Sequence, residues 1–332
     1  MKSNVKITQT ILDSYFNLVK AGLSQRQACK HLGISRGGIQ YVLKNGLKTK
    51  CVEQSVEVEQ PIDVVSKKER HLYPDETSKA KILFYDIETS LALSYHWGQW
   101  KQNLSHKDCV QPSHLLSHAW AWNGGEVTGS ILTREEMLDH DPERLVLEAW
   151  SLFDNADIIV AHNAKKFDVR KVNAYFLSYG LPPPSPYKVI DTLQIAKTKF
   201  ALPFNSLDFL ARYLNVELKV SNSGKQLWID CDRGKQEALD EMLHYNKGDI
   251  TTLRDVYRKI IGWDNNGVNH ALYDDVHDFV CTSCGSDKIE VMVNKFAYTP
   301  QRKYQVYRCK CCGANLRSNT KQGSGNRLLR II

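Results

Sequence analysis

The chain has 332 residues, with 42% apolar and 24% charged side chains, which is the composition of a globular protein rather than a disordered or fibrous one. A length above the usual size of one domain predicts two or three domains. No apolar run is long enough to cross a bilayer, and the first ten residues lack the apolar core of a signal peptide. We therefore expect an intracellular, cytoplasmic protein without a membrane partner.

The net charge of +7 is divided unevenly along the chain. Residues 1–50 carry nine lysines and arginines against one acidic residue, and residues 279–332 carry ten against two. Between these ends, acidic residues outnumber basic ones. Basic ends on an acidic centre favour flanks that hold a polyanion while the centre acts on it. The alternative is that both ends are ordinary solvated segments.

Three short helices are predicted within residues 1–50 from the helical spacing of apolar side chains. The first covers about residues 8–21, the second starts at the N-cap Ser24, and Gly33 allows the turn into the third. The segment resembles a helix-turn-helix domain, in which Cys29 would be a small core residue. By that resemblance, exposed side chains of the recognition helix contact nucleic acid, namely those of Arg36, Gln40 and Lys44. A small helical protein-docking module is the alternative.

Residues 51–79 contain two prolines and no sustained hydrophobic period, so we expect a linker. Beyond it, two strand patterns flank Asn123, Gly124 and Gly125, which predicts a hairpin. Strand patterns then alternate with helical ones. Strands in a meander followed by this alternation indicate an α/β domain over residues 80–265, with a mixed sheet and helices on both faces.

The stretch KILFYDIETS, residues 81–90, is the most informative part of that domain. An apolar strand ends in Asp86 and Glu88, and the strand period of two places both carboxylates on one face. Adjacent carboxylates repel each other, so folding alone gives little reason for the pair. A divalent cation between them would provide one. By itself, the pair is equally compatible with a strand end that reaches solvent.

Two further acidic residues follow in the same domain. Asp168 comes five residues after Asn163 in AHNAKKFD, directly after a predicted strand, and so falls in the first turn of a helix. The helix dipole alone would favour an acid there. Tyr245 and Asp249 are four residues apart and share one face of a predicted helix. For Asp249 alone, a solvated helix surface is the simpler interpretation.

Together these motifs are similar to those of the DEDD exonucleases, the superfamily of polymerase proofreading domains with an RNase H-like fold. Asp-x-Glu at the end of a first strand, Asn-x-x-x-Phe-Asp after a later strand and Tyr-x-x-x-Asp on a late helix occur in that order over about residues 81–261. The resemblance implies that four carboxylates bind two Mg²⁺ or Mn²⁺ ions and that Asn163 helps to place the site. The four are Asp86, Glu88, Asp168 and Asp249. Hard divalent cations prefer such oxygen ligands.

Two details of the motifs allow more than one interpretation. His244 and Asp249 have the spacing of the histidine subclass, whereas Tyr245 and Asp249 have that of the tyrosine subclass. Tyr245 lies one helical turn from Asp249, so we favour it as the group that orients the attacking water. The sequence YNKGD is also similar to the exonuclease of family B DNA polymerases and their stand-alone relatives. Lys165 and Lys166 stand where relatives often carry glycine, and they either contact substrate phosphates or are ordinary exposed lysines.

Residues 91–111 are rich in Trp, His and Asn and lack a clear period, which predicts a loop that crosses near the site. Four of its side chains are able to stack on nucleic-acid bases, namely Tyr95, His96, Trp97 and Trp100. We expect at least two of the four to pack in the core instead.

Nine cysteines are present, and five of them crowd the C-terminal region. An odd total with paired C-x-x-C spacing favours metal ligation over disulfides. The four with the spacing of a structural zinc site are Cys281, Cys284, Cys309 and Cys312. Two strand patterns between the pairs predict a zinc ribbon over residues 279–320, followed by a tail at 321–332. Cys311 is a competing ligand, although the glycine after Cys312 favours Cys312.

Basic and aromatic side chains alternate around this ribbon, as they do on nucleic-acid-binding surfaces. We expect Arg302, Tyr304 and Arg308 to contact the substrate. A ribbon that docks another protein is the alternative.

We therefore expect a metal-dependent 3′→5′ exodeoxyribonuclease with three parts, whose polarity comes from the resemblance alone. Its expected cofactors are two Mg²⁺ or Mn²⁺ ions and one structural Zn²⁺ ion. The expected substrate is single-stranded DNA or the 3′ ends of duplex DNA, and a separate polymerase or a replication or repair protein is a candidate partner. Two alternatives stay open: a DNA-binding regulator with an inactive nuclease fold, and an endonuclease or ribonuclease acting at the same site.

Overall fold

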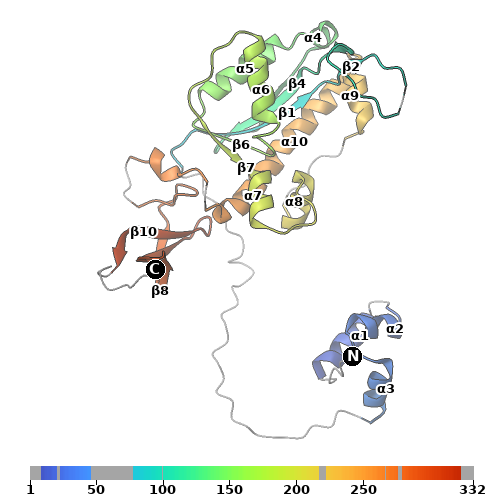
Figure 1. The fold of residues 1–332 in the computed structure, drawn as a ribbon, viewed down its shortest axis with the longest axis vertical. Helices are drawn as coiled ribbons and strands as arrows, with labels where there is room; N and C mark the ends of the chain where they lie inside the picture. The colour runs from blue at the N-terminus through green and yellow to red at the C-terminus, as the bar shows by residue number, and fades with distance from the viewer. Residues whose placement is uncertain are drawn as a thin grey trace. The chain divides into compact units, whose positions relative to one another are not determined.

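The computed structural model describes residues 9–20, 23–45, 78–98, 100–216, 222–265, 267–275 and 279–322 (Figure 1). The chain divides into two compact units, residues 1–64 and residues 65–332. Most of the predicted linker, residues 51–77, and all but the start of the predicted tail lie outside the described residues. In the described part of the chain, no helix is both long and apolar enough to cross a membrane.

Three helices make up the first unit, namely α1 (Gln9–Lys20), α2 (Gln25–His31) and α3 (Arg36–Asn45). Ser24 caps α2 in a capping box with Gln27, whose side-chain oxygen lies 3.0 Å from the Ser24 amide nitrogen. The helices enclose a small apolar core that includes Tyr15, Cys29 and Ile39. The three predicted helices, the cap at Ser24 and the burial of Cys29 are thus confirmed.

A five-stranded mixed sheet forms the centre of the second unit, with the strand order β5-β4-β1-β6-β7 (Figure 1). Its strands are β1 (Ile82–Thr89), β4 (Leu115–Trp122), β5 (Thr128–Ile131), β6 (Ile158–Ala161) and β7 (Lys188–Asp191). β4 runs antiparallel to β1 and β5, whereas β6 runs parallel to β1 and β7. β4 and β5 form the predicted hairpin, whose turn contains Gly124 at a φ of +77°. The predicted mixed sheet is confirmed.

Helices cover both faces of this sheet, as the sequence predicts. Their bounds are α4 (Arg134–Asp139), α5 (Glu143–Asp154), α6 (Asp168–Ser178), α7 (Thr192–Lys199), α8 (Leu207–Leu214), α9 (Lys225–Asp232) and α10 (Gln236–Ile260). Leu83 and Tyr85 on one face of β1 share an apolar cluster with α4, α5, α6 and α9. Ile82 and Phe84 on the other face share a cluster with α7, α8 and the second half of α10. The sequence did not predict α4, α7 or α9, because one or two turns of helix carry little periodicity.

The longest of these helices, α10, has 25 residues and takes part in both clusters. Met242 and Tyr245 in its first half pack in one cluster, and Ile250 and Tyr257 in its second half pack in the other. Two short 3₁₀ helices follow it, η2 (Ile261–Trp263) and η3 (His270–Tyr273).

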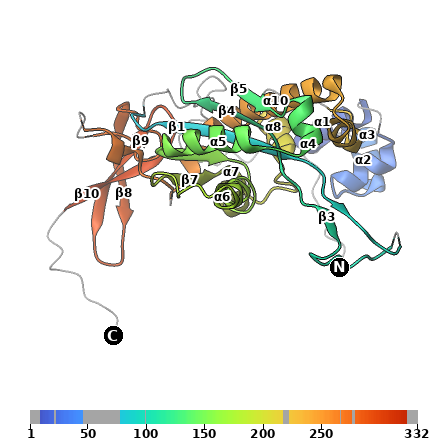
Figure 2. The ribbon, with the colours of Figure 1, turned by 90° about the horizontal axis from the view of Figure 1, so that it is seen from above.

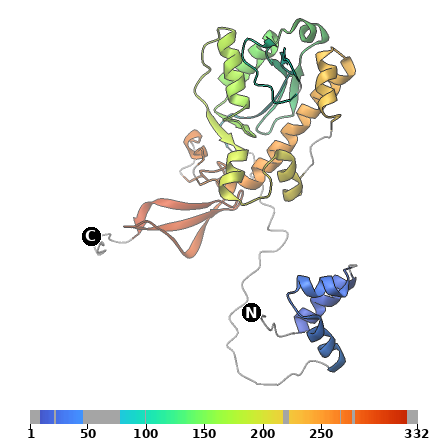
Figure 3. The ribbon, with the colours of Figure 1, turned by 45° about the vertical axis from the view of Figure 1, so that its right-hand side comes forward.

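The C-terminal region folds into a three-stranded antiparallel sheet that starts beside the end of α10 (Figure 3). Its strands are β8 (Ile289–Tyr298), β9 (Lys303–Cys309) and β10 (Asn315–Gln322). The sequence predicts only the first two and starts the tail at residue 321, whereas β10 continues to Gln322. The polar sequence NLRSNTKQ hides this third strand, because it lacks apolar alternation.

The loop after β1 contains two short strands, β2 (Leu93–Ser94) and β3 (Cys109–Gln111), and projects away from the central sheet (Figure 2). The expectation that at least two of its four candidate stacking side chains pack in the core is wrong. Tyr95, Trp97 and Trp100 are 78%, 106% and 87% exposed, and His96 is exposed as well. The two strands pair with each other rather than with the central sheet, so the loop presents these rings to solvent.

Candidate active site

Three carboxylates meet at the C-terminal end of β1. Asp86 and Glu88 extend from one face of this strand, and Asp249 comes from the middle of α10. Each residue offers a carboxylate oxygen, and these three oxygens all lie within 4.8 Å of one another. Asp249 is buried, and the other two are partly buried. The fold thus brings together three of the four residues that the sequence nominates as metal ligands.

Asp168 begins α6 and lies beside the same strand, but outside this group of three. Its carboxylate accepts a hydrogen bond from the amide of Ile87, the residue between Asp86 and Glu88. The residue is 2% exposed, and its Oδ2 has no hydrogen-bond partner among the described residues. Burial raises the pKa of Asp168 to about 7, and the negative charge of Asp191 adds to the increase.

This arrangement fits divalent cations. Three carboxylates at such short separations repel one another, and a divalent cation bound between them would offset that repulsion. Asp168 adds a buried oxygen that lacks a hydrogen-bond donor within the described ranges. Carboxylate oxygens are the ligands that Mg²⁺ and Mn²⁺ prefer. The donor set therefore suits the cations that the sequence predicts.

Asn246 holds Asp86 in place, and the sequence analysis did not identify it as a site residue. It is completely buried and donates a hydrogen bond from Nδ2 to Oδ2 of Asp86 at 2.6 Å. Its Oδ1 accepts a hydrogen bond from the Ser117 hydroxyl at 2.7 Å. The bridge connects β4, α10 and β1. The position of Asn246 three residues before Asp249 on a helix was a usable signal, but its partner on β4 could not be read from the sequence.

We expect Asn246→Ala to weaken divalent-ion binding and turnover by about 10- to 100-fold, because partners that orient metal ligands have effects of that size. Ser117→Ala removes only the outer hydrogen bond and should have a smaller effect. Titration of both purified variants with Mn²⁺ measures the difference. Unchanged Mn²⁺ affinity in a folded Asn246→Ala variant would contradict this role.

A second unpredicted residue, Asp191, shapes the loop that leads to Asp168 through its carboxylate. It ends β7 and caps α7 by accepting hydrogen bonds from two amides in the first turn. The same carboxylate accepts hydrogen bonds from the amides of Asn163 and Lys165, at 3.0 and 3.2 Å. Asn163 has a φ of +74°, a left-handed conformation that Asn tolerates better than most residues. Asn163 therefore contributes to the loop through its backbone.

Tyr245 and His244 differ clearly in burial. Tyr245 is 8% exposed, and its ring packs edge-on against Trp228 with the centroids 6.3 Å apart. It lies one helical turn from the buried Asp249. His244 is exposed to solvent. This placement favours Tyr245 over His244 as a participant in the site.

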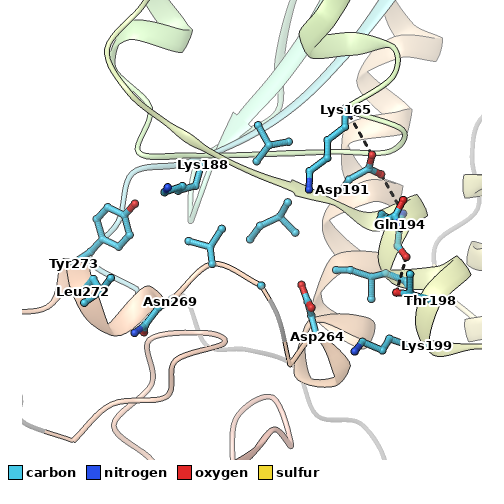
Figure 4. A pocket seen from close by; sticks show the side chains of 15 residues that line it. Lys165, Lys188, Asp191, Gln194, Thr198, Lys199, Asp264, Asn269, Leu272 and Tyr273 are labelled. Carbon is cyan, nitrogen blue, oxygen red and sulfur yellow. Dashed lines mark hydrogen bonds between the residues drawn. The ribbon is translucent and has the colours of Figure 1, made fainter.

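A pocket of about 550 Å³ lies between β7, α7 and the segment after α10 (Figure 4). Lys165 and Asp191 line it, so the pocket adjoins the loop described above. Lys188 and Lys199 contribute two further amines to its wall, and Figure 4 shows the side chain of Lys165 directed into the pocket. Lys165 and Lys166 are both exposed, as a contact with substrate phosphates requires.

Four buried cysteines form a second candidate metal centre. The four Sγ atoms that lie within 4.8 Å of one another belong to Cys281, Cys284, Cys309 and Cys312. Two of the Sγ–Sγ separations are 3.6 and 3.7 Å, which suits a tetrahedron with sulfur about 2.3 Å from a zinc ion. Gly285 and Gly313 follow the two cysteine pairs with φ values of +76° and +75°. Cys311 is buried but lies outside the group of four.

Most of the side chains that the sequence nominates for nucleic-acid contacts are exposed, namely those of Arg36, Gln40, Arg302 and Arg308. The side chain of Lys44 lies outside the described residues. Tyr304 is different, because it is 8% exposed beneath Arg317, whose guanidinium carbon lies 4.5 Å from the ring centroid. The ring of Tyr304 is therefore covered by the protein and is not available to stack on a base.

Part of the chain is similar to a known protein family. Residues 115–261 match the family model of the RNase H superfamily, a stretch that contains Asp168 and Asp249. The five-stranded mixed sheet flanked by helices fits the RNase H-like fold, and the match supports a nuclease of that superfamily. No curated protein is significantly similar in sequence.

Among solved structures, the chain is similar to the family B DNA polymerase from the hyperthermophilic archaeon Pyrobaculum calidifontis. The two share 13% sequence identity, with a TM-score of 0.43. The match covers 55% of this chain and 25% of the polymerase, so the matched part of this chain spans about a quarter of the polymerase's length.

Proposed function

We propose that this protein is a metal-dependent 3′→5′ exonuclease that hydrolyses the phosphodiester bonds of DNA by a two-metal mechanism. The approach of Asp86, Glu88 and Asp249 to within 4.8 Å, with Asp168 beside them, is the observation that carries the proposal. The 3′→5′ direction and the need for a free end come from the resemblance of the motifs to those of DEDD exonucleases.

Each residue of the site has a distinct task in this proposal. The four carboxylates would hold two divalent ions, which would supply activation of a water molecule and stabilisation of the leaving 3′ oxygen. The Tyr245 hydroxyl orients the attacking water. Asn246 fixes the orientation of Asp86 through its hydrogen bond. Asp191 fixes the loop that presents Asp168.

The basic flanks of the chain supply affinity for the substrate. An acidic catalytic domain attracts a polyanion weakly, whereas lysines and arginines at both ends bind phosphates and release counterions. Exposed candidates for these contacts are Arg36 and Gln40 on α3, and Arg302 and Arg308 on the ribbon. The four cysteines bind one structural zinc ion in this proposal.

Digestion of end-labelled nucleic acid tests the proposal. With Mg²⁺ or Mn²⁺, DNA labelled at its 5′ end should give a ladder that shortens from the 3′ end, and Asp86→Ala should abolish it. Circular single-stranded DNA should stay intact, and its cleavage would favour the endonuclease alternative. Matched RNA substrates decide between DNA and RNA. A folded protein that releases no nucleotide from any of these substrates would overturn the enzymatic function.

We expect Lys165→Gln combined with Lys166→Gln to raise the KM for DNA without changing kcat, because both amines are exposed beside the catalytic loop. Loss of two phosphate contacts should reduce the slope of log KM against log salt by about 1.4 for single-stranded DNA. Lys197→Gln, at an exposed position of α7, is the matched control. An unchanged salt slope in the double variant would assign the two lysines to the solvated surface.

A further inference from the structure

The cysteine centre is part of the core of the catalytic unit. All four cysteines, and Cys311, lie in one apolar cluster with Phe84 of β1 and Tyr257 of α10. Phe84 and Tyr257 pack edge to face, with ring centroids 5.3 Å apart. Both side chains are buried. The cysteines of the ribbon therefore belong to the same apolar cluster as the contact between β1 and α10.

The backbone of the ribbon approaches both ends of this contact closely. A Cβ atom added to Gly262, in the 3₁₀ helix η2 that follows α10, would overlap the carbonyl oxygen of Cys312. A Cβ atom added to Gly285 would come within 2.8 Å of Cα of Ser78, four residues before β1. Only glycine at these two positions permits such an approach. The two cysteine pairs are therefore seated against the end of α10 and the entry to β1.

The buried side chain and backbone of His270 form hydrogen bonds to two segments of the chain. The Ser78 hydroxyl lies 3.0 Å from Nδ1 of His270, and the His270 amide donates to the carbonyl of Thr282 at 2.8 Å. Thr282 lies between Cys281 and Cys284 in the sequence. These hydrogen bonds connect the segment before β1 to the first cysteine pair.

The same two elements carry the carboxylate cluster. Phe84 precedes Asp86 by two residues on one face of β1, and Tyr257 follows Asp249 by eight residues, or about 12 Å along the helix. Asp86 and Asp249 belong to different elements. The separation of their carboxylate oxygens therefore depends on how α10 packs against β1. Asn246 connects the two elements beside the carboxylates, and the cysteine pairs approach the end of α10 and the segment before β1 at Gly262 and Gly285.

We propose that the cysteine centre positions the catalytic carboxylates, so that zinc at the cysteines and divalent ions at the carboxylates bind cooperatively. Tyr257 and Gly262 are the positioning residues that connect the two centres. The inference rests on the proposed function, because it requires the carboxylate cluster to bind a divalent ion. In this inference the ribbon positions the carboxylates, in addition to any contact that it makes with nucleic acid.

The wild-type full chain provides the first test. Zinc affinity is measured by competition with a zinc chelator, with and without saturating Mg²⁺ at constant ionic strength. Linkage requires each ion to change the affinity of the other by the same factor, and we expect a factor of about 5 to 150. Asp86→Asn should remove the effect of Mg²⁺ on zinc affinity. If the zinc affinity of the wild type is the same with and without Mg²⁺, the inference is wrong.

Variants that leave every metal ligand intact provide the second test. Mn²⁺ binding to zinc-loaded protein is followed by the electron paramagnetic resonance signal of free Mn²⁺. Gly262→Ala should weaken Mn²⁺ binding about fivefold or more, because its methyl group displaces the second cysteine pair. Tyr257→Ala should do the same, whereas Tyr257→Phe, which keeps the ring, should restore wild-type binding. Gly37→Ala, which meets open space in the other unit, is the control.

These measurements distinguish a failure of this inference from a failure of the proposed function. Equal Mn²⁺ affinity in wild type and a folded Gly262→Ala variant would show that the ribbon does not position the carboxylates. Absence of any Mn²⁺ binding that depends on Asp86 in the wild type would instead overturn the proposed function, and this inference with it.

Discussion

Asp249→Asn is expected to reduce the rate of nucleotide release by about three orders of magnitude or more, equivalent to at least about 4 kcal/mol of transition-state stabilisation. The substitution keeps the shape of the side chain but removes a negative charge from a cluster whose oxygens lie within 4.8 Å of one another. A neutral amide binds a hard divalent cation much less strongly than a carboxylate does. Single-turnover digestion of labelled DNA at saturating metal measures the loss.

The matched control for this variant is Asp240→Asn. Asp240 lies on the same helix, is exposed, and accepts a hydrogen bond only from the neighbouring Gln236 side chain in the described structure. This control should retain wild-type activity. A folded Asp249→Asn variant with more than about one tenth of wild-type turnover would remove Asp249 from the metal site.

Asp168→Asn is expected to stabilise the protein at pH 8 in the absence of Mg²⁺ and Mn²⁺, although it should also abolish turnover. Burial raises the pKa of Asp168 from its ordinary value of 3.8 to about 7. The folded protein therefore holds this proton to higher pH than the unfolded chain. The resulting stability is full below the ordinary pKa and is lost as the pH rises through about 7.

The size of this effect has an upper bound of about 4 kcal/mol, set by a pKa difference of about three units. At pH 8, Asp168→Asn avoids the buried charge and should unfold at higher urea concentration than the wild type. Near pH 4 the two proteins should be similar. The buffers are cleared of Mg²⁺ and Mn²⁺ by a resin, and zinc is left in place. The measured change in stability then reflects the protonation of this carboxylate and not the binding of Mg²⁺ or Mn²⁺. Added Mn²⁺ should stabilise the wild type more than the variant.

One result would contradict a raised pKa for Asp168. If Asp168→Asn lowers stability by the same amount at pH 4 and pH 8, the side chain acts as an ordinary helix-terminal acid. The exposed Asp240→Asn variant again serves as the reference, because its carboxylate lies on the surface.

The motifs that could be read from the sequence are those set by local geometry. The period of two in β1 places Asp86 and Glu88 on one face, and the helical period aligns Tyr245 with Asp249. Glycine after each cysteine pair and the spacing of the pairs likewise depend on short segments. The mixed sheet also followed from the order of strand and helix patterns.

The features that could not be read depend on contacts between distant segments. Asn246 has its two partners on β1 and β4, and the carboxylate of Asp191 bonds amides near Asn163. The placement of the ribbon beside β1 and α10 also depends on tertiary packing, because its cysteines share an apolar cluster with Phe84 and Tyr257. The loop after β1 was misjudged for a related reason, because large aromatic side chains are usually packed and only the fold shows that these project into solvent.

A crystal structure with Mn²⁺ and a nucleoside 5′-monophosphate would show whether these carboxylates bind a pair of divalent ions, since anomalous scattering identifies each Mn²⁺ ion. We expect two Mn²⁺ peaks about 3.5–4 Å apart at the end of β1, in contact with Asp86 and Asp249 and with the phosphate between them. Absence of Mn²⁺ from these carboxylates in a structure that contains the bound nucleotide would contradict this expectation.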